Sequence, residues 1–259
     1  MKVEEIYISG FKAAFRGMRN PYDSWEKSDS YFSKIETDAG ISKSFEYLPF
    51  DTFCLYNDIV RKNEEPVDRV FDINDFVKDS FELDYDMSIG ENDMRLARKL
   101  IKGGSVHSKF LRYITVTMDL TAPFDFWKQY DTYKVATVAN SCSTMHTITK
   151  HKLTLDNFSL AGLRPKDIRQ LKKNIKYLNS VINDDDLTDL EKTRICSKLL
   201  PEGFEQKRTI EINYATLEGM YKWRKNHKLL EWKWFCSQII ENLPYFKEFF
   251  INDIRNVTE

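Results

Sequence analysis

The hydrophobic pattern near the N-terminus predicts one strand followed by one helix. Hydrophobic and polar positions alternate over residues 3–9, which is the period of a half-buried strand. The next segment, Phe11–Arg19, predicts a short helix. Residues 20–88 are rich in Asp, Ser, Tyr and Phe but have only weak periodicity. We therefore predict short helices and loops over that stretch.

The helical signal becomes clearer from Glu91 onward. Apolar residues recur there at helical spacing until Gly103-Gly104, a pair that favours the end of a helix. Residues 110–120 (FLRYITVTMDL) are dense in β-branched and aromatic side chains and predict a strand. Pro123 follows this strand and suits the first turn of another helix.

The second half of the chain continues to mix helices and strands. The regular strand–helix alternation that signals a parallel, doubly wound sheet is missing, so the pattern favours the α+β class. The predicted elements are helices at residues 164–182 and 186–199, a strand at 207–213, and helices at 214–225 and 231–243.

Composition and charge narrow the class of protein. The 259 residues include 42% hydrophobic and 31% charged side chains, a normal balance for a folded domain. The 39 Lys and Arg residues nearly match the 40 Asp and Glu residues, so no global charge draws the chain to nucleic acid or to a membrane surface. Any polyanion that it binds must therefore meet a local site. The charged start and the absence of a long apolar run predict a cytoplasmic protein without a membrane helix.

Several common catalytic and metal-binding motifs are missing from the sequence. It contains neither Gly-x-Gly-x-x-Gly nor a Walker-type phosphate loop, and neither His-Glu-x-x-His nor Gly-x-Ser-x-Gly. Cys142 and His146 could share a helix face, but no second pair lies nearby, so we expect no metal site. The four cysteines are far apart, which argues against a disulfide framework.

Three blocks in a fixed order instead resemble one enzyme family. The first is a helix from Asp93, Gly-Gly, His107, the strand FLRYITVTMDL and Ala122-Pro123. This order is similar to that of the flavin-dependent thymidylate synthases, in which a histidine at the position of His107 lies beside the flavin. The resemblance implies an α+β fold with a central, mostly antiparallel sheet flanked by helices.

The second block resembles the signature of this family, Gln-x-x-Arg-His-Arg followed by Ser, Asn-Glu and Ser-x-Arg-Tyr. Here Gln129 is retained, but Arg-His-Arg becomes Thr132-Tyr133-Lys134. Two guanidinium groups suited to bidentate pairing with a diphosphate are thus reduced to one ammonium group and a hydroxyl. The later positions that match are Thr137, Asn140-Ser141 and Ser143-Thr144-Met145-His146, after one inserted residue.

The third block resembles the family's Leu-Pro, Asn-Ala-Arg, Leu-Arg and Ala-Gln-Trp-Glu series. The positions that keep this spacing are Leu200-Pro201, Asn213, Leu217, Arg224 and Glu231-Trp232. The second arginine of the family's Asn-Ala-Arg triplet is Ala215 in this chain. The resemblance covers residues 89–250, whereas residues 1–88 are divergent, and we expect one domain over residues 1–259.

The resemblance implies a role for each matched residue and a set of ligands. It implies Arg224 as the catalytic residue that polarises the pyrimidine. It implies that FAD binds to His107, Lys109, Tyr133, Lys134 and Asn213, and that the nucleotide binds to Gln129, Asn140, Ser141 and Ser143. Methylenetetrahydrofolate and NADPH would be co-substrates, dUMP or a related nucleotide the methyl acceptor, and the assembly a homotetramer with no nucleic-acid or membrane partner.

Three functions remain open from the sequence. The first is a flavoenzyme that converts dUMP to dTMP or methylates a related pyrimidine nucleotide, and the second is a non-catalytic paralogue that binds a nucleotide or a protein. The third is an unrelated Phe-rich binding protein without a similar pocket. Individual residues also have structural interpretations: Arg224 near a helix end complements the helix dipole, and Asn140, Ser141 and Ser143 are typical of caps and turns. Trp232 belongs to an aromatic cluster typical of a core or a subunit interface.

Overall fold

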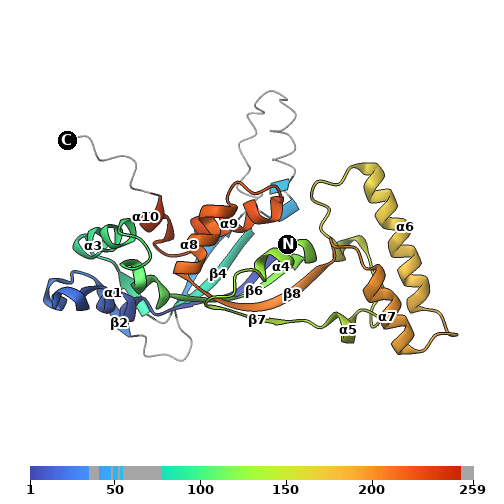
Figure 1. The fold of residues 1–259 in the computed structure, drawn as a ribbon, viewed down its shortest axis with the longest axis horizontal. Coiled ribbons are helices and arrows are strands. Elements are labelled where there is room, and N and C mark those ends of the chain that lie inside the picture. Colours follow the sequence, from blue (N-terminus) through green and yellow to red (C-terminus); the bar gives the residue numbers. More distant parts are fainter. Residues whose placement is uncertain (35–40, 48, 52, 55–76, 84, 252–259) are drawn as a thin grey trace, which may run out of the picture.

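The computed structural model describes residues 1–34, 41–47, 49–51, 53–54, 77–83 and 85–251. Within these residues, six strands form one sheet through the body of the protein (Figure 1). Only the pair β1–β4 is parallel, and the other neighbours are antiparallel. The predicted α+β class with a mostly antiparallel sheet is therefore confirmed. Across the sheet, the strands are β3 (Ile41–Tyr47), β4 (Val77–Leu83), β1 (Lys2–Ser9), β6 (Thr115–Pro123), β8 (Glu205–Asn213) and β7 (Thr137–Ser141).

The centre of the sheet is built by β6 and β8, which pair along their whole length. Alternate side chains of both strands are buried, among them Val116 and Met118 on β6 and Ile210 and Ile212 on β8. This period of two arises because successive side chains of a strand point to opposite faces. One face of the sheet thus carries the apolar side chains that pack against helices.

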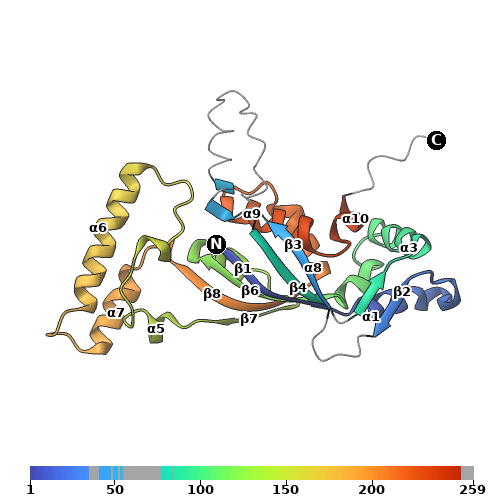
Figure 2. The same cartoon turned by 180° about the vertical axis from the view of Figure 1, so that it is seen from behind.

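Helices cover that face of the sheet. Figures 1 and 2 show α8 (Tyr214–Arg224) and α9 (Leu230–Asn242) above the strands, with α4 (Phe124–Tyr130) beside them. Their aromatic side chains form the centre of the core: the rings of Phe126 and Trp232 lie 4.3 Å apart, and Trp232 lies 5.9 Å from Phe235. The short helix α10 (Phe246–Phe250) contacts α9 at the end of the chain's described part.

A second group of elements closes one end of the sheet. It contains α1 (Phe11–Arg19), α3 (Glu91–Lys102), the short 3-10 helix η4 (Ser108–Arg112), and the ribbon of β2 (Tyr31–Lys34) with β5 (Tyr85–Ser88). Gly10 precedes α1 with a φ of 89°, and a Cβ there would lie 1.9 Å from the carbonyl oxygen of Tyr113. Only glycine allows this close approach.

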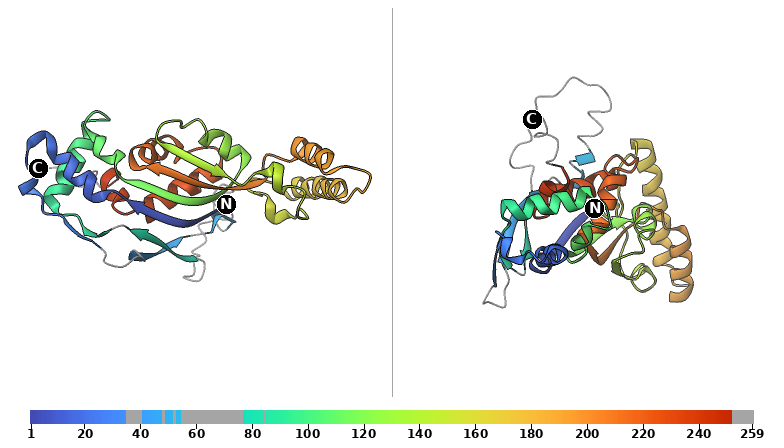
Figure 3. Two further views of the ribbon diagram at one scale, coloured as in Figure 1. Left: turned by 90° about the horizontal axis from the view of Figure 1, so that it is seen from below. Right: turned by 60° about the vertical axis from the view of Figure 1, so that its left-hand side comes forward.

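A helical hairpin projects from the opposite end of the molecule (Figure 3). It consists of α6 (Pro165–Ile182) and α7 (Asp189–Leu199), preceded by α5 (Thr144–Thr147) and the 3-10 turn η5 (Leu155–Asn157). We call residues 144–200 the arm. The arm has a hydrophobic core separate from that of the body; its buried members are Ile148, Leu153, Phe158, Leu171, Ile175, Leu178, Val181 and Cys196.

The prediction for residues 20–88 is wrong over its described strands. Two 3-10 turns, η1 (Asn20–Tyr22) and η2 (Trp25–Lys27), agree with short helical segments, but β2, β3, β4 and β5 lie in the same stretch. These strands occupy the two-stranded ribbon and the β3 side of the sheet, where pairing partners come from distant segments. Residues 35–40, 48, 52, 55–76 and 84 lie outside the described residues.

Other boundaries shift by a few residues. The strand predicted at residues 110–120 begins only at Thr115, because Phe110 and Leu111 are buried in η4 against α1. The helix after Pro123 begins at Phe124, with Pro123 as the N-cap. The helix predicted from residue 186 begins at Asp189, because Thr188 and Glu191 form a capping box there. The other predicted helices and strands are confirmed within two residues.

Candidate functional site

Arg224, the last residue of α8, is held by two neutral side chains from one neighbouring segment. Its Nε donates a hydrogen bond to the Tyr133 hydroxyl at 2.9 Å, and its Nη1 donates to Gln129 Oε1 at 2.9 Å. Among the described residues, no carboxylate forms an ion pair with Arg224. The guanidinium group is therefore fixed in orientation while its positive charge stays uncompensated by a neighbouring anion.

An aromatic wall lies against the same guanidinium group. The Arg224 Cζ lies 5.1 Å from the centroid of the buried Trp232 and 5.6 Å from that of Tyr133, within the range of cation–π contacts. The Nε1–H of Trp232 and the hydroxyl of Tyr130 are buried, and neither has a hydrogen-bond partner in the described part of the chain. Both unpaired groups flank Phe126, so this part of the core retains unused polar capacity.

Burial and the guanidinium charge also affect titratable groups near the cluster. Burial lowers the pKa of His227, and the positive charge of Arg224 lowers it further. Burial raises the pKa of the Cys236 thiol to about 12, although Arg224 acts in the opposite direction. At neutral pH this thiol is protonated, so Cys236 is a packed side chain and no nucleophile.

A loop aligns the predicted flavin motif along α8. The Thr216 hydroxyl, in the first turn of α8, donates to the carbonyl oxygen of Val135, and the Thr137 hydroxyl donates to that of Tyr133. Between these anchors Lys134 is exposed, and its side chain forms no hydrogen bond or ion pair with a described residue. The loop thus brings Tyr133 to Arg224 and leaves the ammonium group of Lys134 in solvent.

Asn213, His107 and Lys109 lie at the other end of α8. The buried Asn213 is the N-cap of α8, since its Oδ1 accepts from Thr216 N at 3.0 Å. His107 immediately precedes η4, and Lys109 lies within η4; both are exposed, and η4 packs against α8. The 11-residue helix α8 separates Asn213 from Arg224 by about 16 Å along the helix axis.

A third group of predicted residues lies on the edge of the sheet. Asn140 and Ser141 are exposed on β7, and Ser143 is the N-cap of α5. Met145 lies beside α7, where the Ser197 hydroxyl contacts its sulfur at 3.4 Å. Within the described part of one chain, the predicted residues therefore form three groups, and the side-chain hydrogen bonds between predicted residues are those of Arg224 with Gln129 and Tyr133.

Sequence reasoning missed a second cation near this region. Arg208 on β8 stacks over Trp127, with its Cζ 4.3 Å from the ring centroid, and its Nη1 donates to Asp131 at 2.9 Å. Strand pairing places it opposite Ser141. Alternation along β8 predicts which face Arg208 occupies, but no local signal in the sequence indicates the stacking.

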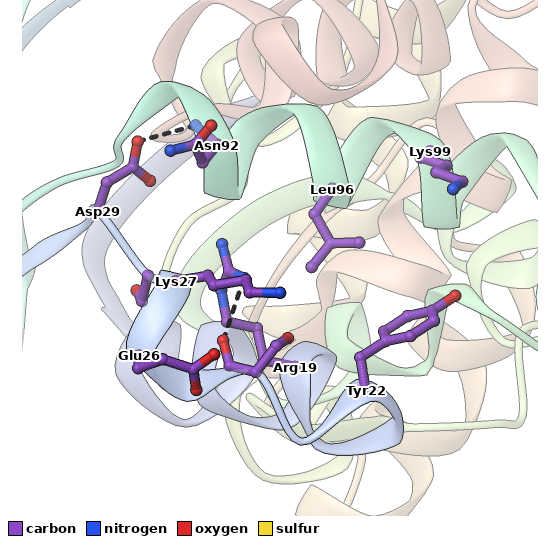
Figure 4. A pocket seen from close by; sticks show the side chains of 10 residues that line it. Arg19, Tyr22, Glu26, Lys27, Asp29, Asn92, Leu96 and Lys99 are labelled. Carbon is purple, nitrogen blue, oxygen red and sulfur yellow. Dashed lines mark hydrogen bonds between the residues drawn. The ribbon is translucent and has the colours of Figure 1, made fainter.

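One cavity in the described part of the chain is lined by none of the predicted site residues. It has a volume of about 810 Å³ between η2 and α3, and Figure 4 shows Leu96 of α3 pointing toward the side that carries Arg19 and Tyr22. Arg19 is buried in a salt bridge with Asp93, and the carboxylate of Asp29 accepts from the first backbone N–H groups of α3. This charged network ties α1 to α3, which is a structural role.

Comparison with solved structures identifies the fold. One match is the crystal structure of flavin-dependent thymidylate synthase ThyX from Helicobacter pylori complexed with FAD and dUMP. It covers 98% of this chain and 99% of that chain, with a TM-score of 0.59 and 13% sequence identity. This chain has the ThyX fold. At 13% sequence identity, this similarity shows a shared fold and does not show a shared function.

Two further solved structures are similar to this chain with lower TM-scores. A second Helicobacter pylori ThyX structure with FAD and dUMP has a TM-score of 0.48 over 82% of this chain and 98% of that chain. A UMP/dUMP methylase, PolB from Streptomyces cacaoi, bound with 5-Br UMP, has a TM-score of 0.45 over 58% and 75%. Both are 13% identical to this chain. No family model and no curated protein matches the sequence.

The described residues offer neither a metal-binding cluster nor a membrane-spanning helix. The described residues contain no group of three or more His, Cys, Asp or Glu side chains placed to hold a metal ion. No helix in the described part of the chain is both long enough and apolar enough to cross a membrane.

Proposed function

We propose that this protein transfers a one-carbon group from methylenetetrahydrofolate to C5 of a pyrimidine nucleotide, dUMP or a close relative, with FAD as cofactor and NADPH as reductant. The observation that carries the proposal is the Arg224 cluster in a ThyX fold. Its two oriented N–H donors and uncompensated charge suit an oxygen that gains negative charge during reaction.

The surroundings of Arg224 would strengthen this effect. Tyr133 and Trp232 place aromatic surface against the guanidinium group, which lowers the local dielectric and strengthens the interaction of its charge with a nearby oxygen. Gln129 fixes one N–H while the Tyr133 hydroxyl occupies the other. A pyrimidine carbonyl oxygen would exchange with one of these neutral acceptors, so substrate binding would break no ion pair.

The chain's remaining donors fit a flavin dinucleotide. His107, Lys109 and Lys134 are exposed, and their side chains form no hydrogen bond or ion pair with described residues. Ammonium groups bind phosphate as point charges. Asn213 uses its Oδ1 as a helix cap and keeps its amide N–H groups for a ligand. We assign these four residues to FAD, with Tyr133 beside them. When bound, the flavin would deliver the reducing equivalents for methyl formation.

Asn140, Ser141 and Ser143 would contact the nucleotide from a different copy of the chain. Their group on β7 and α5 is separated from Arg224 in one chain, and exposed apolar side chains, Val138 and Met145, accompany it. A tetramer in which neighbouring chains complete each site would bring the groups together. This arrangement supports the proposed homotetramer.

One observation favours a second function, nucleotide binding without catalysis. The hydroxyl of Thr132 donates to Gln129 O, and that of Tyr133 accepts from Arg224, so the altered motif spends both hydroxyls within the chain. Of the three motif residues, only Lys134 remains for a diphosphate. A chain that held its nucleotide but not its flavin would act as a binding module.

An absorption spectrum separates the two functions. The purified protein is incubated with FAD, freed of excess and scanned, and a retained flavin band at one per chain is expected from the proposed enzyme. Turnover of dUMP with methylenetetrahydrofolate and NADPH is then measured by dTMP formation. Absence of flavin together with calorimetric binding of dUMP would establish the binding module instead.

A further inference from the structure

The outer face of α6 carries an array of cations without partners. Arg169, Lys172, Lys173 and Lys176 are all exposed, and none forms a hydrogen bond or ion pair with a described residue. The only acidic side chain on α6, Asp167, is paired with Arg164 at 2.7 Å. The array is therefore a local basic surface on a chain whose net charge is −1.

Helix geometry places the four cations on one side. Lys172 and Lys173 each lie three or four residues from both Arg169 and Lys176, so the four cations share one side over about 10 Å of helix. Like charges at these spacings repel and destabilise an isolated helix. Since no carboxylate in the described part of the arm offsets them, the array is suited to an external polyanion.

The surroundings of the array select among polyanions. The apolar ridge of α6, which includes Leu171, Ile175 and Leu178, is buried inside the arm, so α6 has no apolar face left to enter a bilayer. Interfaces between proteins usually have an apolar centre formed by both partners. On this face of α6, the half-exposed Tyr177 is the only large apolar side chain available for such a centre. A phosphate backbone requires neither feature.

We propose that the outer face of α6 binds the phosphodiester backbone of single-stranded nucleic acid. In Figure 1, α6 forms the outermost edge of the molecule, so a long strand can reach it without obstruction from the body. Tyr177 flanks the array with 54% of its surface exposed and offers a ring on which an unpaired base can stack. The proposal departs from the expectation of no nucleic-acid partner, and it agrees with a balanced net charge that leaves polyanion binding to a local site.

The length of the array sets the expected strength of binding. Within a duplex, each strand carries a phosphate about every 3.4 Å along the axis. A single strand that binds with this spacing would place about three phosphates against an array of about 10 Å. Affinity for single strands then falls with a logarithmic salt slope of about −2, or about 20-fold between about 50 and 200 mM salt. Dissociation constants of about 1–100 μM at physiological salt are expected.

Fluorescence anisotropy with labelled oligothymidylate and oligouridylate tests the proposal on the full chain. The variant Arg169→Gln/Lys172→Gln/Lys173→Gln/Lys176→Gln should lose at least about 10-fold in affinity and most of its salt slope. Tyr177→Ala should weaken binding and leave the slope unchanged. Glutamine is a good helix former, so circular dichroism should show α6 intact.

A charge-matched variant controls for the change in net charge. Arg16→Gln/Lys27→Gln/Lys99→Gln/Lys102→Gln removes one Arg and three Lys from exposed positions on the body and should keep the affinity of the unaltered protein. Equal losses in the two variants, or no loss in the α6 variant, would overturn the proposal. So would phosphatidylserine-vesicle binding that depends on the array while oligonucleotides fail to bind. Flavin content and turnover are separate readouts, and the proposal does not depend on them.

Discussion

The guanidinium group of Arg224 owes its orientation to a phenol and an amide, both of them neutral. A charge held in this way is available to a ligand, whereas one paired with a carboxylate would first have to be released. The same arrangement makes the residue tolerant to change in the folded state, because Gln129 and Tyr133 are only half-buried and can bind water instead.

Replacement of Arg224 tests its role directly. Arg224→Ala should reduce pyrimidine turnover by at least about 100-fold, as for loss of one oriented donor to a developing oxyanion. Arg224→Lys keeps the charge without the planar fork and should restore only part of that loss. Thermal unfolding should change little, and the exposed Arg16→Ala serves as the control. Full turnover in Arg224→Ala would remove this residue from the mechanism.

At the residue scale, Gln129, Tyr133 and Arg224 could be predicted from the sequence as site residues, but the hydrogen bonds between them could not. Gln129 and Tyr133 lie 95 and 91 positions before Arg224, and no local pattern reports a hydrogen bond across such a separation. Trp232 was assigned to a core or interface; it is buried, and it also contacts the guanidinium group. A buried indole without an acceptor is visible only once the fold is known.

The elements around β8 and α8 add a second testable residue. Asn213 ends the strand and caps the helix, so one side chain has both a folding role and a proposed flavin role. Asn213→Ala should cost about 1 kcal/mol of stability through loss of the cap, and it should also weaken flavin retention. Asn213→Asp keeps the capping oxygen, so it should be as stable as the unaltered protein and still lose flavin. Flavin retention in both variants equal to that of the unaltered protein would contradict the assignment.

The junction between the arm and α9 predicts a pH dependence. Burial raises the pKa of Glu231; the Ser159 hydroxyl, which donates to its Oε1 at 2.7 Å, opposes this, and the neighbouring Asp125 raises the pKa further. A carboxyl group whose pKa is higher in the folded than in the unfolded state contributes its full stabilisation at low pH. For Glu231 this means pH values below its unfolded pKa of about 4.3. That contribution is lost as pH rises through the folded value.

Glu231→Gln should remove this dependence, since glutamine cannot ionise and can still accept from Ser159. Its Tm should match that of the unaltered protein near pH 4 and exceed it near pH 8, if the titration of Glu231 acts as described. Thermal unfolding monitored by circular dichroism across this range provides the measurement. Glu26→Gln, an exposed change of equal charge, should leave the curve unaltered. Parallel curves for the unaltered protein and Glu231→Gln would refute the prediction.

At the element scale, the sequence predicted the elements whose burial follows a single period. α1, α3, α6 and α9 present apolar residues at helical spacing, and β1 and β8 alternate. It missed β2 to β5, whose strands gain their identity from distant partners: β2 pairs with β5, and β4 lies between β1 and β3. The predicted strand wrongly includes Phe110 and Leu111, because aromatic and aliphatic content does not distinguish a strand from a packed 3-10 turn.

The whole molecule carries its predicted site residues at three separate places, which makes assembly a central question. Light scattering coupled to size exclusion should give four times the chain mass of 30.7 kDa. Val138→Asp and Met145→Asp would place charges on the exposed apolar edge and should dissociate the tetramer, because interface centres exclude charge. Turnover should fall with the assembly. A fully active monomer would show that the three groups serve separate purposes.

The two hydrophobic cores described above should make the arm and the body separate cooperative units in unfolding. Phe204 lies between them and contacts Phe158 of the arm and Phe124 of the body, with ring centroids 5.6 Å apart in both pairs. Native-state hydrogen exchange should therefore show amides of α6 and α7 opening together at a lower free energy than those of β6 and β8. Phe204→Ala should widen that difference, and uniform exchange across the molecule would contradict it. A protein built this way can release its arm while the sheet and the Arg224 cluster stay folded.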